Sequence, residues 1–173
     1  MTSFIRRITT ACVARRSRVR IGNEAWNTLI AELGHRTGSV REAGAFLLAR
    51  AGDERRSVVR VVYFDDVDPD CLTGGITMHS TGFDALWSIC NAEGLRVVAD
   101  VHTHPGDFVR QSAIDRANPM IASAGHVAII VPDLASRLPS AQECGVHTYR
   151  GAHTWEQALE VQASRALYIG RWA

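Results

Sequence analysis

The sequence predicts a single α/β domain built around a central mixed sheet. Apolar runs with the composition of strands, such as 95–101 and 126–132, alternate along the chain with segments of helical periodicity, such as 23–34 and 83–94. Interleaved strands and helices are typical of α/β folds. The length of 173 residues fits one domain. A content of 46% hydrophobic and 21% charged residues is that of an ordinary globular protein.

The first half of the chain is expected to contain a helix followed by a hairpin. Asn23 is a favourable N-cap, apolar residues recur after it at helical spacing, and Gly34 is expected to end the helix. Two runs rich in strand-forming residues, 43–50 and 57–64, flank a Gly-Asp turn. This arrangement predicts an antiparallel pair of strands.

The second half is expected to supply most of the sheet. Ser112 is another favourable N-cap, and Pro119 is expected to shorten the helix that Ser112 begins. A last helix is expected over 155–163, because Thr154 can cap it. The remaining strands are predicted at 75–79, 95–104, 126–132, 144–149 and 167–172.

Charge and hydropathy exclude several classes of protein. The net charge of +1 provides no bulk attraction for nucleic acid, and no apolar run approaches the roughly 20 residues of a membrane helix. Residues 1–18 are expected to form a basic arm or edge segment ahead of a domain over 19–173. The arm lacks the apolar core of a secretory signal, so a cytoplasmic location is expected. All 19 basic residues are arginine, which fits either a GC-rich genome or avoidance of lysine modification.

The four cysteines, Cys12, Cys71, Cys90 and Cys144, lie far apart in the sequence. They form no Cys-X-X-Cys motif, so a cysteine-rich zinc site is not expected. A zinc nucleobase deaminase, which needs such a motif, is disfavoured for the same reason. We expect the cysteines to be buried free thiols.

The most informative stretch runs from Asp100 to Asp115. His102 and His104 lie two residues apart at the end of a predicted strand, so they share a face with Cα atoms about 6–7 Å apart. Asp115 lies in the first turn of the helix that Ser112 begins. Two histidines and one carboxylate leave the fourth position of a zinc ion open, as in catalytic zinc sites. Asp100 shares the strand face of the histidines and is either a partner of one imidazole or the third ligand in place of Asp115.

This pattern of His-Thr-His-Pro, a loop, and then Ser-Ala-Ile-Asp resembles the signature of the JAB/MPN (JAMM) zinc peptidases. The similarity extends over roughly residues 19–132. Members of that family carry a glutamate upstream of the motif, and Glu42, just before the apolar run 43–50, matches it. The resemblance implies a JAB/MPN-like α-β-α sandwich with a central mixed sheet.

The resemblance also implies an activity and a role for each residue. His102, His104 and Asp115 would hold a Zn²⁺ ion. Glu42 would act as general base and then general acid, and Ser112 would donate a hydrogen bond to the developing oxyanion. The family cleaves peptide or isopeptide bonds after the C-terminus of ubiquitin or ubiquitin-like proteins, so such a protein or its conjugates is the expected partner.

The chain is similar to the compact bacterial members of the family, because it lacks long insertions after the Ser112 helix. Such members are often encoded beside activating-like and conjugating-like enzymes, which are further expected partners. Two alternatives stay open: a hydrolase acting on adducts of sulfur-carrier proteins, and a non-catalytic MPN-type scaffold that binds a partner. Thr103 and Gln111 argue against a RadC-like protein. The substrate tail is expected to add as a strand to an edge formed by 95–104.

Overall fold

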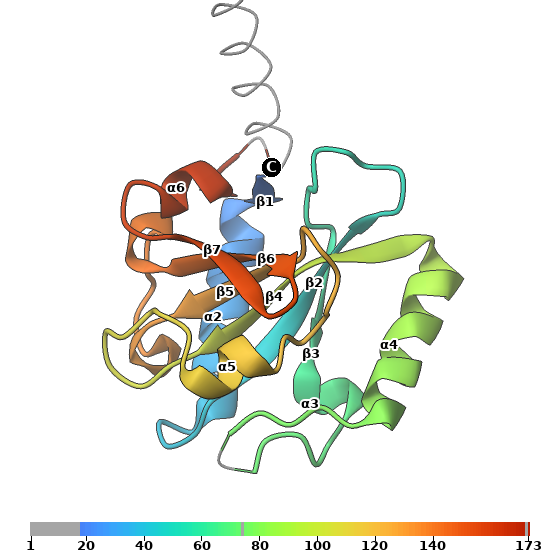
Figure 1. Ribbon diagram of the computed structural model, residues 1–173, viewed down its shortest axis with the longest axis horizontal. Helices are drawn as coiled ribbons and strands as arrows, with labels where there is room; N and C mark the ends of the chain where they lie inside the picture. The colour runs from blue at the N-terminus through green and yellow to red at the C-terminus, as the bar shows by residue number, and fades with distance from the viewer. Residues whose placement is uncertain (1–17, 74, 172) are drawn as a thin grey trace, which may run out of the picture.

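The computed structural model describes residues 18–73, 75–171 and 173. They fold into a single α/β domain around a mixed six-stranded sheet with the strand order β3-β2-β4-β5-β6-β7 (Figure 1). The predicted fold class is therefore confirmed. The predicted basic arm lies outside the described residues except for Arg18, and so does Cys12.

All neighbouring strands of the sheet are antiparallel except β4 and β5, which run parallel. A separate parallel pair joins β1 (Val19–Ile21) to β8 (Leu167–Ile169). The six strands of the main sheet are β2 (Gly44–Arg50), β3 (Arg60–Tyr63), β4 (Leu95–Thr103), β5 (Val127–Val131), β6 (Gly145–Gly151) and β7 (Thr154–Ala158).

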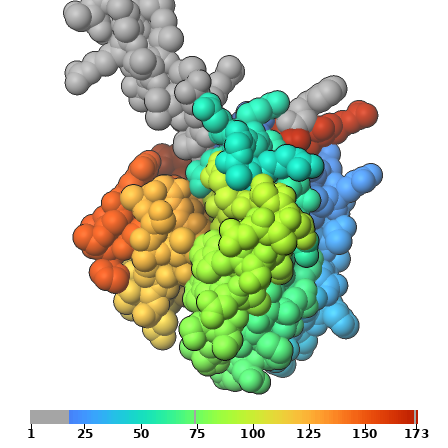
Figure 2. Space-filling model, turned by 90° about the vertical axis from the view of Figure 1, so that its right-hand side faces the viewer, coloured from blue at the N-terminus to red at the C-terminus, as the bar shows by residue number. Residues whose placement is uncertain are grey.

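Helices cover both faces of the sheet. In Figure 1, α2 lies behind the sheet and α5 lies in front of it, and the turned view in Figure 2 places their residues on opposite sides of the molecule. The helices are α2 (Asn23–Thr37), α3 (Phe64–Val67), α4 (Ser80–Glu93), α5 (Ala113–Ala117) and α6 (Ala163–Ala166), with 3-10 turns η1 (Asp133–Ala135) and η2 (Ala141–Glu143). Among residues 18–73 and 75–171, no helix has the length and apolar character needed to span a bilayer.

β4 is an inner strand, which explains its nearly continuous apolar sequence. It pairs with β2 on one side and β5 on the other, and most of its residues are buried. Strands buried on both faces read as apolar runs and not as alternating patterns. The expectation that 95–104 offers a free edge to a substrate strand is therefore wrong.

Two predicted elements differ from the structure at the C-terminal end and in the middle of the chain. Residues 154–158 form β7 instead of starting a helix, because they pair with β6 along its whole length. The segment 75–79 makes only an isolated bridge, between Ile76 and Leu72, and no strand. The hairpin and the helices begun near Asn23 and Ser112 are confirmed.

The first helix also differs in its ends. α2 has Gly22 as its N-cap, makes no side-chain cap hydrogen bond there, and runs past Gly34 to Thr37. Gly34 is inside the helix for a packing reason, because a Cβ atom there would lie 2.8 Å from the carbonyl oxygen of Ala135. Gly38, with a φ of +54°, ends the helix instead.

The described cysteines are buried free thiols, as expected. Burial raises the pKa of both Cys71 and Cys144 to about 12. Near pH 8 only about 10⁻⁴ of such a thiol is ionised, and the thiolate is the reactive form. We therefore expect iodoacetamide to leave Cys71 and Cys144 unmodified in the folded protein, as read by peptide mass spectrometry. The same thiols should react fully in denaturant, and equal rates in the two states would contradict the burial.

Candidate metal centre

His102 and His104 converge at the end of β4. The backbone N–H of His104 donates to the Val131 carbonyl over 2.9 Å, so pairing with β5 continues past the last residue of β4. The extended backbone therefore keeps both imidazoles on one face of the sheet. Their Nε2 atoms lie only 3.1 Å apart, and both side chains are buried.

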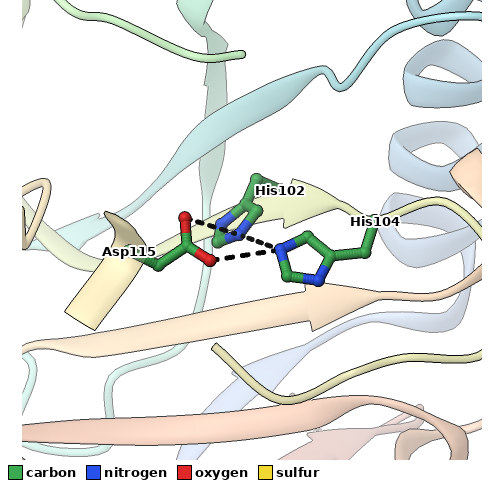
Figure 3. A group of neighbouring side chains, drawn as sticks. All are labelled: His102, His104 and Asp115. Atoms are coloured by element: carbon green, nitrogen blue, oxygen red, sulfur yellow. Dashed lines mark hydrogen bonds and ion pairs between the residues drawn. The ribbon is translucent and has the colours of Figure 1, made fainter. Parts of the chain in front are cut away.

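Asp115 approaches the two histidines from α5 (Figure 3). One carboxylate oxygen lies 3.3 Å from His104 Nε2, and the other lies 3.9 Å from His102 Nε2. A capping box fixes the approach: the Ser112 N–H donates to Asp115 over 2.7 Å, and the Asp115 N–H donates to the Ser112 hydroxyl over 3.1 Å. The capping box thus orients the Asp115 carboxylate toward the two histidines.

The three side chains fit a metal ion. Their candidate ligand atoms all lie within 4.8 Å of one another. Two ligand atoms at ~2.0–2.1 Å from one zinc ion, in tetrahedral arrangement, are separated by about 3.3 Å. The two Nε2 atoms, 3.1 Å apart, and the pair of His104 Nε2 with its nearer Asp115 oxygen, 3.3 Å apart, are close to that value. The other Asp115 oxygen lies 3.9 Å from His102 Nε2. The group could therefore hold a metal with small side-chain adjustments.

Each ring has an oxygen atom on its far side, next to Nδ1, and its Nε2 atom faces the point between the two rings. His104 Nδ1 donates to the Phe108 carbonyl over 3.0 Å. His102 Nδ1 faces a carboxylate oxygen of Asp100 at 3.8 Å. A proton on Nδ1 leaves the Nε2 lone pair for a metal. Asp100 therefore lies behind His102, and Asp115 is the carboxylate grouped with the two histidines.

The electrostatics of the site favour an ionised Asp115. Burial opposes its ionisation, but His104, His102 and the Ser112 cap together hold the pKa of Asp115 well below its usual range. Burial also opposes a charge on His102, yet Asp100, and after it Asp115 and Glu42, raise the pKa of that imidazole. The surrounding carboxylates thus favour positive charge where the two rings meet.

Glu42 lies beside the histidines, just before β2. Its Oε1 atom is 4.0 Å from His104 Nε2. The next residue is pinned to β4: the Ala43 N–H donates to the Thr103 hydroxyl over 3.1 Å, and the Thr103 N–H donates to the Ala43 carbonyl over 2.9 Å. Thr103 points away from its two histidine neighbours and so sets the position of Glu42.

The Ser112 hydroxyl lies beside the site. Its oxygen accepts from the Asp115 N–H over 3.1 Å, and its side chain also helps to lower the pKa of Asp115 by hydrogen bonding. A hydroxyl carries one hydrogen of its own, which rotates to suit its acceptor. The Ser112 hydroxyl can therefore donate to a group that enters the site.

A cavity of about 430 Å³ opens between α5 and the segment 75–77, with β4 and β5 at its floor. Glu42, His102, Ser112 and Asp115 line it on the metal side. Its remaining wall is partly apolar and includes Ile76, Ile114, Met120 and Trp155. Trp155 also fixes the far end of α5, since its indole N–H donates to the Arg116 carbonyl over 3.1 Å.

Three residues that support the site could not be identified from the sequence: His126, His147 and Gly145. His126 and His147 are both buried, and both make hydrogen bonds next to the two candidate metal histidines. His147 Nε2 donates to the Val109 carbonyl over 3.0 Å, which anchors the loop after His104. Gly145 lets the same carbonyl approach, because a Cβ atom there would lie 1.8 Å from the Val109 oxygen.

Comparisons with known proteins show a shared fold. No protein-family model matches the sequence. A solution structure of a Desulfitobacterium hafniense protein matches with a TM-score of 0.62 at 15% identity, over 88% of this chain and 93% of that one. A solution structure of a Salinibacter ruber protein matches with a TM-score of 0.53 at 17% identity, over 83% and 91%.

A crystal structure of a JAB1/MPN domain protein from Archaeoglobus fulgidus also matches, with a TM-score of 0.44 at 16% identity, over 83% of this chain and 96% of that one. The first two matches are similarities of fold alone. The third, at a TM-score below 0.5, is too weak to add to them.

Proposed function

We propose that this chain is a zinc-dependent peptidase or isopeptidase of the JAB/MPN (JAMM) type that cleaves after the C-terminus of ubiquitin or a ubiquitin-like protein. The observation that carries the proposal is the meeting of His102, His104 and Asp115 at one point. Glu42 and Ser112 lie beside the same point. These five residues match the family motif in type and in order along the chain.

His102 and His104 would hold the ion through Nε2, and Asp115 through a carboxylate oxygen. A zinc ion held there supplies a Lewis acid that polarises a carbonyl and lowers the pKa of a bound water toward ~7. The described ligand group contains three side chains, which leaves a fourth position open, as in catalytic sites and unlike closed structural ones.

The other residues would handle protons and charge. Glu42 accepts a proton from the attacking water and later delivers it to the leaving amine. The Ser112 hydroxyl donates to the oxygen of the carbonyl under attack as negative charge develops on it. Both groups lie on backbone that is fixed by hydrogen bonds, Glu42 through Ala43 and Ser112 through its cap.

The substrate tail would enter the cavity between α5 and residues 75–77, because β4 has no free edge. The metal side of that cavity is acidic and polar, and its outer wall is apolar. We propose that a narrow tail of small residues passes the metal. The folded body of the ubiquitin-like protein, and its conjugating and activating partners, would then contact the protein outside the cavity.

Zinc content and cleavage test the proposal together. The purified protein should carry about one zinc ion per chain, and His104→Ala should lose it, because one of three ligands is gone. The exposed His153 serves as control, and His153→Ala should keep the ion. A panel of ubiquitin-like fusions ending in small residues should be cleaved by the zinc-loaded protein.

Each negative outcome has its own meaning. If the protein holds no zinc after purification without chelators, the proposed zinc-dependent hydrolase activity is excluded. Zinc binding without cleavage of any fusion in the panel would favour the non-catalytic scaffold. Cleavage of unrelated peptides at the same rate as the fusions would make the protein a general peptidase.

A further inference from the structure

We infer that Asp100 and His126 are positioning residues that hold His102 with its Nε2 lone pair directed at the metal point. The inference rests on the metal binding of the proposed function, but it concerns residues outside the family motif. Neither residue belongs to the group that could hold a metal. They act on that group through the far side of the His102 ring.

The three side chains form a buried row across β4 and β5. The Asp100 side chain is exposed by only 3% and that of His126 by only 4%. His126 Nε2 lies 2.5 Å from one carboxylate oxygen of Asp100, and the other oxygen faces His102 Nδ1 at 3.8 Å. Asp100 therefore lies between two imidazoles, one of which carries a candidate metal-ligating nitrogen.

Two hydrogen bonds fix the backbone of His126. Its N–H donates to the Ser123 carbonyl over 2.9 Å, and its carbonyl accepts from the Tyr149 N–H over 2.8 Å. The parallel register of β4 and β5 pairs Asp100 with Ala128, two residues beyond His126. The pairing of β4 with β5 therefore places the His126 imidazole, on a fixed backbone, next to the buried Asp100 carboxylate.

Burying a carboxylate without hydrogen-bond donors costs free energy. The position of the Asp100 carboxylate is therefore set by the donors around it. His126 satisfies one oxygen and leaves the other turned toward His102. A carboxylate behind a ligating histidine accepts its second N–H, fixes the tautomer and orients the ring. Without His126, the Asp100 carboxylate would lose the partner that holds it in this orientation.

In this inference the two candidate metal histidines carry their proton on the same nitrogen, Nδ1, for different reasons. His104 uses a backbone carbonyl, that of Phe108, which no side-chain substitution removes. His102 depends on Asp100, and Asp100 depends on His126. The row behind His102 can therefore be tested by substitution.

A double-mutant cycle on zinc affinity tests the order of this dependence. We would measure zinc dissociation constants by competition with a chromophoric chelator for the wild type, Asp100→Ala, His126→Leu and the double variant. Residues behind a metal ligand typically contribute ~10–100-fold to metal affinity. We expect His126→Leu to weaken zinc binding about 10-fold and the double variant to match Asp100→Ala alone. His126→Gln, which keeps an N–H donor, should recover most of the loss.

Asp68 and His79 form a matched control pair. Asp68 is buried, its carboxylate lies 2.8 Å from His79 Nδ1, and neither residue lines the metal cavity. His79→Leu removes the same kind of contact and should leave zinc affinity unchanged. Equal affinity of wild type and His126→Leu, or losses that multiply in the double variant, would overturn the inference.

A second readout needs no metal and no substrate. In ¹⁵N-edited spectra of the metal-free protein, the Nδ1–H of His102 should exchange slowly with solvent in the wild type and faster in Asp100→Ala and His126→Leu. If this proton is unaffected by both substitutions, the inference fails whatever the protein binds. If it responds and zinc affinity falls as expected but no fusion is cleaved, the proposed activity fails and the inference stands.

Discussion

Glu42→Gln should retain one zinc ion per chain and lose about 10²–10⁴-fold in cleavage rate, the usual contribution of a general acid–base. Glutamine keeps nearly the volume and hydrogen-bonding reach of glutamate but cannot take up the proton of the attacking water. Glu42 lies 4.0 Å from His104 Nε2 and is not among the three grouped ligands. Single-turnover cleavage of a ubiquitin-like fusion, with zinc content measured on the same sample, gives both numbers.

The exposed Asp107 provides the control for this experiment. Asp107→Asn removes one negative charge from the loop after His104 and should cleave at a nearly normal rate. A Glu42→Gln variant as active as Asp107→Asn would show that Glu42 is not the base. Loss of zinc from Glu42→Gln would instead make Glu42 a ligand or a support for one.

Gly145→Ala should destabilise the protein and weaken its zinc binding together. A Cβ atom at this position would lie 1.8 Å from the Val109 carbonyl oxygen and 2.8 Å from His147 Nε2. Overpacking of a buried site lowers the free energy of unfolding by ~1–3 kcal/mol. Because the clash here is with a backbone atom, we expect a loss near the upper end of that range. For a chain of this size, about 2–3 kcal/mol corresponds to a fall in Tm of roughly 4–12 °C.

Zinc affinity should fall because the displaced segment also orients His104, through the Phe108 carbonyl. Gly52→Ala is the control, since a Cβ atom there meets no atom within 4 Å. That variant should melt and bind zinc like the wild type. A Gly145→Ala protein with unchanged Tm and zinc affinity would show that the loop shifts without consequence.

The grouping of His102, His104 and Asp115 could be predicted from sequence because each step is local. Alternation along a strand places the two histidines on one face, and a capping box places Asp115 in the first turn of α5. The capping carboxylate also faces the histidines, so one side chain serves both the cap and the candidate metal group.

Asp100 could be named from the sequence as a possible partner of one imidazole, but the contacts of His126 and His147 could not be predicted, because long-range pairing creates them. His126 meets Asp100 only through the register of β4 and β5, and His147 meets Val109 only through the placement of β6. The helix predicted over 155–163 is wrong where residues 154–158 form β7. The turn before β7 has positive φ at Ala152 and His153. Hairpin turns of that kind usually contain Asn-Gly or Asp-Gly, and this turn contains neither, so the sequence gives no sign of the hairpin.

The helix that carries Asp115 has an unusual dependence on its surroundings. α5 contains five residues, none of them buried, and so short a helix is marginal on its own. Besides its own cap, α5 is held by the Trp155 contact at its far end and by the ion pair of Asp115 with His104. An ion shared by His104 and Asp115 would therefore act as a cross-link, closing the loop between β4 and α5 and lowering the entropy of its open forms. The order of α5 would then depend on whether the site holds an ion.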